Sequence, residues 1–413
     1  MYYIKKSTQG WECMKKEKLK EKVISNFKKE EFIDLLSDII KIPSHKEVDW
    51  QEDKIANYLY DYLKINNIDE VKLDYIKENR PNVIAKIKGK SNGKSLMLNG
   101  HLDTIPPYSM IIPAYKPVIK NGYIQGRGVV DMKGPLASMI MALTLIKKAK
   151  IELAGDVYFT GVIDQEQRSI GTVNLIEKNL KTDFAVVGEP TNLKICKAHK
   201  GMEWIKIIVK GKSVHGSTPE KGYNPIYHAS RIATEIEKFN KKLKEKVNEV
   251  VGYSTINVGV ISGGNDPNIV PNVTHLEVDR RYTNEENREK IYEEIEKIIA
   301  KLKTSNPNFE TEVIPMNDRI CPLGNLPFHN NDDNILFKSL KKSTNKYTNN
   351  ESEVTSFRGW SDAALLDNKL GINSVIFGPG LTEKCHAADE KIKISELVKA
   401  VKIYISLIID ICS

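Results

Sequence analysis

The sequence predicts an α/β catalytic domain interrupted by a smaller domain whose elements follow the order β-α-β-β-α-β. Two observations lead to this expectation. Short apolar runs alternate with a helical pattern over residues 82–195, and α/β character returns after residue 317, whereas residues 199–316 follow the second order. The chain also has 413 residues, which is too long for one ordinary hydrophobic core.

The segment before residue 199 is expected to form buried strands around one long helix. Within it, GPLASMIMALTLIKKAK has Pro135 in a first helical turn and lysines in the last turn, which favours a helix. The predicted strands are short apolar runs rich in β-branched residues, namely VIAKI, SLMLNG, DVYFTGVI and FAVVGE.

Residues 199–316 predict a self-contained, ferredoxin-like unit. Its first helix is expected to begin after Asn224, an N-cap residue followed by proline. Its second helix carries Ile291, Ile295 and Ile299 on one face. Strands are expected at EWIKIIVKG, STINVGVISGG, VTHLEVDRRYT and FETEVIP.

The remaining segment predicts a helix that Gly371 ends, a strand at INSVIFGPG and an amphipathic terminal helix, ISELVKAVKIYISLIIDI, that packs on the domain rather than spanning a membrane. These patterns set the expected domain boundaries. They are an N-terminal extension without stable order at residues 1–20, a catalytic domain in two parts at 21–198 and 317–413, and the inserted domain at 199–316.

Composition argues against several classes of protein. The net charge of +8 comes from lysines spread along the chain and mixed with acids, so no nucleic-acid partner is expected, although small anionic substrates suit it. No apolar run has the length of a membrane span, and the N-terminus lacks the apolar segment of a signal peptide. The five cysteines are scattered and odd in number, which fits a reducing compartment. We therefore expect a cytoplasmic protein without a membrane partner.

Acidic and imidazole residues gather at the ends of the predicted strands, where α/β sheets build their sites. His101 and Asp103 follow SLMLNG, and a carboxylate beside a histidine often orients a metal-bound imidazole. Asp131 lies in GRGVVDMKG, just before the predicted helix, where an aspartate is also a common helix cap. Each of these motifs alone is weak evidence of a site.

Three further residues complete the pattern. Glu166 lies in VIDQEQRSIGT, Glu189 in VVGEPT and His386 in KCHAADE. With His101 and Asp131 they provide imidazole and carboxylate ligands for two metal ions. Zinc accepts both ligand types at about 2.0–2.2 Å, and a shared carboxylate can bridge two ions roughly 3.5–4 Å apart.

Together with SVHGSTP and NIVPN, these motifs resemble the zinc-dependent metallopeptidase family that includes acetylornithine deacetylase, succinyl-diaminopimelate desuccinylase, aminoacylase and carboxypeptidase G. The resemblance covers nearly the whole chain, from the segment around Pro43 to the C-terminus. It implies a zinc-peptidase-like catalytic domain and an inserted domain that acts as a lid. It also implies a homodimer formed through this lid.

The same resemblance implies two divalent metal ions, zinc by this likeness, with cobalt and manganese as alternatives. His101 and Glu189 would hold one ion. Glu166 and His386 would hold the other ion. Asp131 would bridge the two ions.

The resemblance also assigns roles outside the metal ligands. Asp103 would orient His101. His215 would stabilise the developing oxyanion of a neighbouring active site, and Asn268 and Arg281 would bind the polar end of the substrate. From the residues alone, His215 could equally be a solvated loop histidine, Asn268 a turn residue and Arg281 a surface cation.

The implied reaction is hydrolysis of an N-acyl amino acid or dipeptide amide, with a glutamate before Glu166 as general base. Here that position is Gln165, and a carboxamide cannot shuttle a proton near neutral pH. Four explanations remain open. The glutamine is engineered, the chain binds metal and ligand without efficient turnover, Asp164 is the base, or the alignment is shifted so that Glu166 is the base and Gln167 the ligand.

Overall fold

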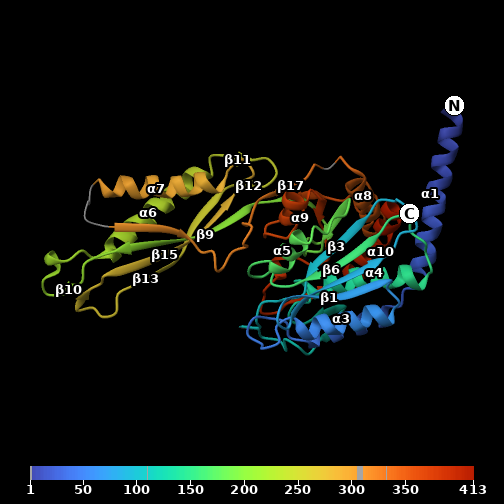
Figure 1. The fold of residues 1–413 in the computed structure, drawn as a ribbon, viewed down its shortest axis with the longest axis horizontal. Coiled ribbons are helices and arrows are strands. Elements are labelled where there is room, and N and C mark those ends of the chain that lie inside the picture. Colours follow the sequence, from blue (N-terminus) through green and yellow to red (C-terminus); the bar gives the residue numbers. More distant parts are fainter. Residues whose placement is uncertain (1, 109, 305–309, 332) are drawn as a thin grey trace. The chain divides into compact units, whose positions relative to one another are not determined.

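The computed structural model describes residues 2–413 except 109, 305–309 and 332, and for residues 2–10, 12 and 13 it describes the backbone alone. The chain divides into two compact units (Figure 1). The first comprises Met1–Ala198 and Asn330–Ser413, and the second comprises His199–His329. In the part of the chain that the structure describes, no helix is both long and apolar enough to cross a membrane.

The first unit is built on a mixed sheet with the strand order β1-β2-β6-β3-β7-β19-β8, and β18 pairs with β8. β3 runs parallel to β6 and β7, β19 runs parallel to β7, and β1 and β2 form an antiparallel edge. The strands are β1 (Glu70–Lys77), β2 (Arg80–Ile87), β3 (Leu96–His101), β6 (Val157–Val162), β7 (Phe184–Val187), β8 (Ile195–His199), β18 (Val354–Ser356) and β19 (Asn373–Ile376).

Successive side chains of a strand point to opposite faces of the sheet. Apolar side chains occur on both faces here, and helices cover both faces. Val83 and Ala85 of β2 point into the main core, whereas Ile84 points to the other face and packs with Leu175 of α5. The helices that contribute to the main core are α2 (Lys29–Lys41), α3 (Asp53–Ile65), α4 (Lys133–Lys148), α8 (Ile335–Thr348) and α10 (Ile394–Cys412). The unit also contains the shorter helices α5 (Ile170–Glu177) and α9 (Ala363–Leu370).

The terminal helix differs in one respect from the expected amphipathic pattern. Every residue of α10 from Ile403 to Ile409 is buried, so the second half of the helix has no solvent-facing side. Helices α4, α8 and α1 (Tyr2–Ile24) all pack against α10 and enclose it. The predicted extension at residues 1–20 falls on α1, whose Lys20 is buried and pairs with Asp410 at 2.7 Å.

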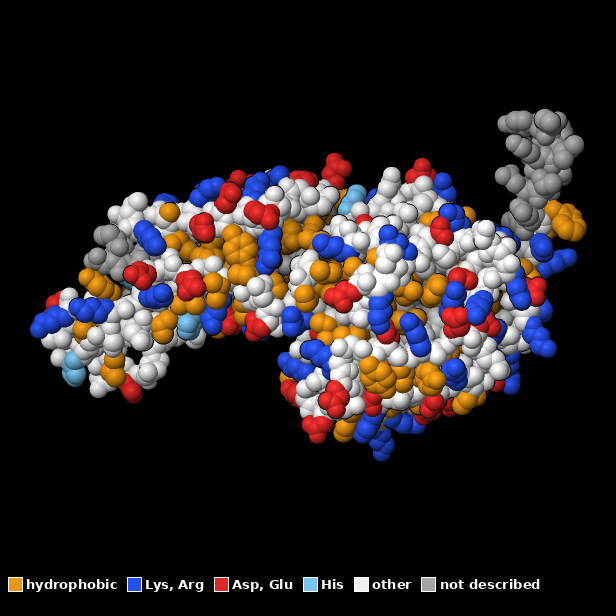
Figure 2. All heavy atoms as spheres, in the orientation of Figure 1, with side chains coloured by type: hydrophobic (Ala, Val, Ile, Leu, Met, Phe, Trp, Pro, Cys, Tyr) orange, Lys and Arg blue, Asp and Glu red, His pale blue; other side chains and the backbone are white. Residues whose placement is uncertain are grey.

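A small sheet with the order β20-β5-β4 completes the first unit, with β4 (Val118–Lys120), β5 (Tyr123–Gln125) and β20 (Lys391–Lys393). It joins the segment before α4 to the segment after residue 386 through antiparallel pairing. On the surface of this unit, basic and acidic side chains are interspersed over the face that Figure 2 shows. This distribution is typical of a solvated surface.

The second unit has the predicted order of elements. They are β9 (Gly201–Lys210), α6 (Pro225–Leu243), β13 (Thr255–Gly263), β15 (Val273–Tyr282), α7 (Arg288–Lys303) and β16 (Glu310–Pro315), in an antiparallel sheet of order β13-β15-β9-β16. Asn224 caps α6 by accepting from the Ile226 N–H at 3.0 Å, and Ile291, Ile295 and Ile299 of α7 are buried. The mixed α/β fold class predicted from the sequence is therefore confirmed.

The second unit extends past the boundary expected at residue 316 and ends at His329. Asn325 explains the difference. Its carbonyl accepts hydrogen bonds from the Met202 N–H and the Tyr282 hydroxyl, and its side chain accepts from the Cys321 N–H. The bonds from Met202 and Tyr282 tie the segment to β9 and β15, and no local sequence pattern marks these two long-range bonds.

Candidate metal centre

Four neighbouring strands carry the candidate ligands to one edge of the sheet. β3 ends at His101, and the loops after β6, β7 and β19 contain Glu166, Glu189 and His386. These strands are parallel, so their carboxyl ends meet at the same edge. Asp131 reaches the same place from the turn that precedes α4.

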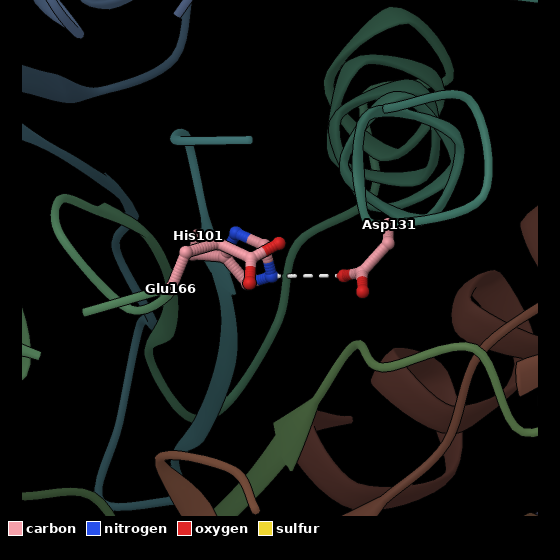
Figure 3. Close-up of side chains that lie close together, drawn as sticks. All are labelled: His101, Asp131 and Glu166. Atoms are coloured by element: carbon pink, nitrogen blue, oxygen red, sulfur yellow. Dashed lines mark hydrogen bonds and ion pairs between the residues drawn. The ribbon is translucent and has the colours of Figure 1, made fainter. Parts of the chain in front are cut away.

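Asp131 lies between the two histidines. Its Oδ1 is 3.0 Å from Nε2 of His101, and its Oδ2 is 3.4 Å from Nε2 of His386. His386 Nε2 is also 3.0 Å from Oε1 of Glu166. Ligand atoms of His101, Asp131 and Glu166 all lie within 4.8 Å of one another, and Figure 3 shows the His101 ring directed at Asp131.

Glu189 adds a buried carboxylate to this group. Its side chain is almost fully buried, and its Oε1 has no hydrogen-bond partner among the described residues. Burial raises the pKa of Glu189 well above its usual range, and the charge of Asp131 raises it further. A buried carboxylate oxygen with no hydrogen-bond partner fits a cation ligand, because an unpaired buried charge is otherwise costly.

The raised pKa values of His101 and His386 also indicate a site that attracts positive charge. The bonds to Asp131 and Glu166 raise the pKa of His386 to about 10. Burial opposes protonation of His101, but its bond to Asp131 and the charge of Asp103 outweigh burial and raise its pKa. Imidazole nitrogens that face carboxylates share a proton in this arrangement, and a divalent cation can replace that proton. The donor set of imidazole and carboxylate therefore fits zinc, cobalt or manganese.

Asp103 lies beside His101, but its carboxylate has other partners. The Nδ1 atom of His101 is 2.8 Å from the backbone carbonyl oxygen of Asp103 and 3.6 Å from its carboxylate. The carboxylate accepts the backbone N–H groups of Gln165 at 3.1 Å and Glu166 at 2.9 Å. The carbonyl thus fixes the ring, while the carboxylate acts on it through charge and also holds the loop after β6.

Gln165 lies in that loop, with its side chain partly exposed. Its Nε2 donates to the backbone carbonyl of Trp360 at 3.2 Å. The side chain of Gln167 is exposed, whereas Glu166 contacts His386. This arrangement favours Glu166 over Gln167 as a ligand, and it places Gln165 next to the ligand cluster in sequence.

The sequence did not indicate the buried pair that holds the Asp131 loop. Glu390 accepts the N–H groups of Gly128 at 3.0 Å, Val130 at 2.9 Å and Asp131 at 3.3 Å, and the guanidinium of Arg127 at 2.7 Å. The only local signal is the position of Glu390 shortly after His386, in the segment that also contains this candidate ligand.

The remaining predicted residues belong to the second unit. His215 is exposed, and its Nδ1 is 2.7 Å from the Ser217 hydroxyl. Asn268 lies beside it, because its carbonyl accepts the Gly216 N–H at 2.7 Å. Arg281 lies near the end of β15 and pairs with Asp279 at 3.0 Å.

An α/β sheet with imidazole and carboxylate ligands at the carboxyl ends of its strands defines a metallohydrolase-type centre. A sequence model of the family described as "Peptidase family M20/M25/M40" matches residues 97–410. The chain therefore belongs to this family and is a metal-dependent hydrolase of amide or peptide bonds.

Named relatives agree with this assignment. The chain is 27% identical to N-formyl-4-amino-5-aminomethyl-2-methylpyrimidine deformylase of Halalkalibacterium halodurans, over 81% of this chain and 83% of the relative. It is 26% identical to a protein of Staphylococcus epidermidis named probable succinyl-diaminopimelate desuccinylase, over 90% and 95% of the two chains. In fold it is similar to an M20 family metallo-carboxypeptidase of Sulfolobus solfataricus, with a TM-score of 0.74, 21% identity and coverage of 92% and 99%.

Proposed function

We propose that this chain binds two divalent metal ions and hydrolyses the amide bond of a small N-acyl amino acid or dipeptide. One observation carries the proposal. The two carboxylate oxygens of Asp131 face different imidazoles, His101 at 3.0 Å and His386 at 3.4 Å. A carboxylate whose two oxygens each face a different candidate metal-binding imidazole is suited to bridge two ions.

In this proposal His101 and Glu189 hold one ion, Glu166 and His386 hold the other, and Asp131 bridges. When bound, the ions supply Lewis acidity, which polarises a carbonyl oxygen and lowers the pKa of water. Hydrogen bonds to backbone groups hold the candidate ligands: the Asp103 carbonyl binds the His101 ring, and the backbone N–H groups of Asp131 and Glu166 donate to buried carboxylates. Little rearrangement of these ligands is therefore required when substrate arrives. The acyl-group chemistry of the deformylase and desuccinylase relatives supports an N-acyl substrate.

In this proposal the general-base position is 165, where this chain has a glutamine whose carboxamide cannot take up the proton. Asp164 is a poor substitute as base, because its carboxylate is buried and paired with Arg80 at 2.8 Å. A positioned base contributes about 10²–10⁴ in rate, so this chain is proposed to turn over slowly. The second candidate function is a protein that binds metal and ligand without efficient turnover. It is favoured by the hydrogen bond from the Gln165 Nε2 to the Trp360 carbonyl, because this bond uses an amide donor that a carboxylate base would lack.

The second unit is proposed to act as lid and dimerisation domain. Val273 and Arg281 lie near opposite ends of β15, about 26 Å apart at a rise of about 3.3 Å per residue. The pair His215 and Asn268 lies toward the Val273 end of this strand. One small substrate cannot span that distance, so we propose that His215 and Asn268 serve a partner's site while Arg281 serves another. This proposal separates Asn268 from Arg281, although the family resemblance implies that both bind the polar end of the substrate.

The experiment compares the chain with its Gln165→Glu variant after metal analysis. Both proteins, loaded with zinc or cobalt, are assayed on N-formyl, N-acetyl and N-succinyl amino acids and on dipeptides. We expect the variant to hydrolyse at least one substrate at least tenfold faster, with unchanged metal content. Equal rates would show that position 165 is not the base. Absence of hydrolysis in both proteins, with ligand binding retained, would favour the second function.

A further inference from the structure

Besides the pair of Arg127 and Glu390, a second buried ion cluster contacts the loop that presents Glu166, through Asp164. Arg80, at the start of β2, donates from Nε and Nη2 to the two carboxylate oxygens of Glu52, at 2.8 and 2.6 Å. Its Nη2 also donates to Oδ1 of Asp164 at 2.8 Å. The exposed side-chain fractions are 13% for Arg80, 2% for Glu52 and 6% for Asp164. One guanidinium therefore holds two buried carboxylates with geometry that only arginine provides.

Asp164 is the turning point of the loop. Its φ is +69°, in the left-handed region that residues with a side chain rarely adopt. Its carbonyl oxygen accepts the N–H groups of Gln167, Arg168 and Ser169 at 3.2, 2.9 and 2.6 Å. A residue in this conformation persists only when its surroundings fix it. The bond from Arg80 fixes the Asp164 side chain and so provides that constraint.

Glu166 follows two residues later and is held on its other side by Asp103, which accepts its N–H at 2.9 Å. The loop is thus fixed at Asp164 by a cation and at Glu166 by a carboxylate. The geometry points to Arg80 as a positioning residue that sets the direction of the Glu166 carboxylate and thereby the affinity of the metal position formed by Glu166 and His386. This inference rests on the proposed two-metal function.

The alternative is a purely structural role, in which Arg80 joins β2 to the start of α3 through Glu52. The two roles predict different results. A structural staple would lower the melting temperature without changing one metal position more than the other. A positioning residue would weaken the position that Glu166 forms and spare the position that His101 and Glu189 form.

The test is titration of metal-free protein with Co²⁺ alone, followed by calorimetry and by the visible absorption of bound cobalt. Arg80→Met removes the charge and the fork, and Arg80→Lys keeps the charge without the fork. Glu166→Ala marks which binding step belongs to the Glu166 position. Arg288→Met is the matched control, because Arg288 also binds a buried glutamate, Glu203, with Nε and Nη2 at 3.0 and 2.8 Å, but in the second unit.

We expect Arg80→Met to weaken the step that Glu166→Ala abolishes by about 10–100-fold, with the other step changed less than threefold. Arg80→Lys should give an intermediate loss, and it remains informative where Arg80→Met does not fold. Arg288→Met should lower the melting temperature and leave both steps unchanged. Unchanged affinities in both Arg80 variants, or equal weakening of both steps, would overturn the inference. Failure of the wild-type chain to bind two Co²⁺ ions would instead refute the proposed function.

Discussion

The loops that present Asp131 and Glu166 are held by the same kind of bond in different surroundings. In the first loop, the Glu390 carboxylate accepts the N–H groups of Val130 and Asp131 and pairs with Arg127. Both charged side chains of that pair are buried, at 1% and 2% exposure. This loop therefore depends on an ion pair within the core, and its stability is coupled to that of the unit.

In the second loop, the Asp103 carboxylate accepts the N–H groups of Gln165 and Glu166, and the Arg80 guanidinium donates to the Asp164 carboxylate. Here the anchoring cation, Arg80, is 13% exposed, against 2% for Arg127, and it is shared between Glu52 and Asp164. The difference suggests a division of roles. Damage to the first loop should be seen mainly in folding, and damage to the second loop mainly in metal binding.

The largest effect expected from a single substitution comes from Glu390→Ala. The substitution leaves Arg127 as an unpaired buried cation and removes the acceptor of three backbone N–H groups. We expect a loss of about 3–5 kcal/mol in the free energy of unfolding and a fall in Tm of roughly 3–8 °C. Calorimetry of the metal-free protein measures both.

The control is the double variant Arg127→Ala and Glu390→Ala. It removes both charges, so its loss should be smaller than the sum of the two single losses. A loss below about 1 kcal/mol for Glu390→Ala would show that the first loop does not depend on the core ion pair.

How far the sequence predicts this site depends on the kind of contact. The candidate ligands His101, Glu166 and Glu189 could be predicted because each lies at or after the end of a buried apolar strand, and the ends of parallel strands meet. Glu390 and Arg80 could not be found in this way. Glu390 is 260 residues from the Val130 N–H that it accepts, and Arg80 is 84 residues from Asp164. No local spacing encodes such bonds, although they hold the loops that carry the candidate ligands.

The fold shows the same limit. Asn224 and Pro225 predicted the start of α6 because helix capping is local. The terminal helix was expected to be amphipathic and packed, but its sequence pattern did not predict that every residue from Ile403 to Ile409 is buried. Its solvent exposure is decided by α1, α4 and α8, which pack around it and are distant in sequence. Local propensity predicts elements, whereas tertiary packing decides which of their faces are buried.

The second prediction concerns metal addition. A ligand that binds only the folded chain stabilises it by about 2.7 kcal/mol for each site at a free concentration one hundred times its Kd. We expect Co²⁺ to raise the free energy of unfolding by about that amount for each of the two proposed ions. In Glu166→Ala the gain should fall to that of one ion. An equal gain in the wild-type chain and this variant would place Glu166 outside the metal centre.

The third prediction probes the bonds in the second loop. Asp103→Asn keeps the shape of the side chain but replaces one carboxylate oxygen by an amide donor, which cannot accept an N–H group. One of the two bonds to Gln165 and Glu166 is therefore lost. We expect a loss of about 1–3 kcal/mol in unfolding free energy and a weaker Glu166 metal position. If Co²⁺ affinity is unchanged, the backbone bonds do not position this ligand.

The smallest expected effect is that of Gln165→Ala, which asks whether the second loop is held by its backbone or by its side chains. The substitution removes the bond from Nε2 to the Trp360 carbonyl, at 3.2 Å, and leaves the backbone bond to Asp103 in place. We expect a loss of about 0.5–1.5 kcal/mol in unfolding free energy and unchanged Co²⁺ affinity. Gln167→Ala, at an exposed neighbour, serves as the control and should change stability by less than about 0.5 kcal/mol. Should Gln165→Ala weaken cobalt binding as strongly as Asp103→Asn, the side chain of Gln165 would be part of what holds Glu166, and the contrast between the two loops would fail.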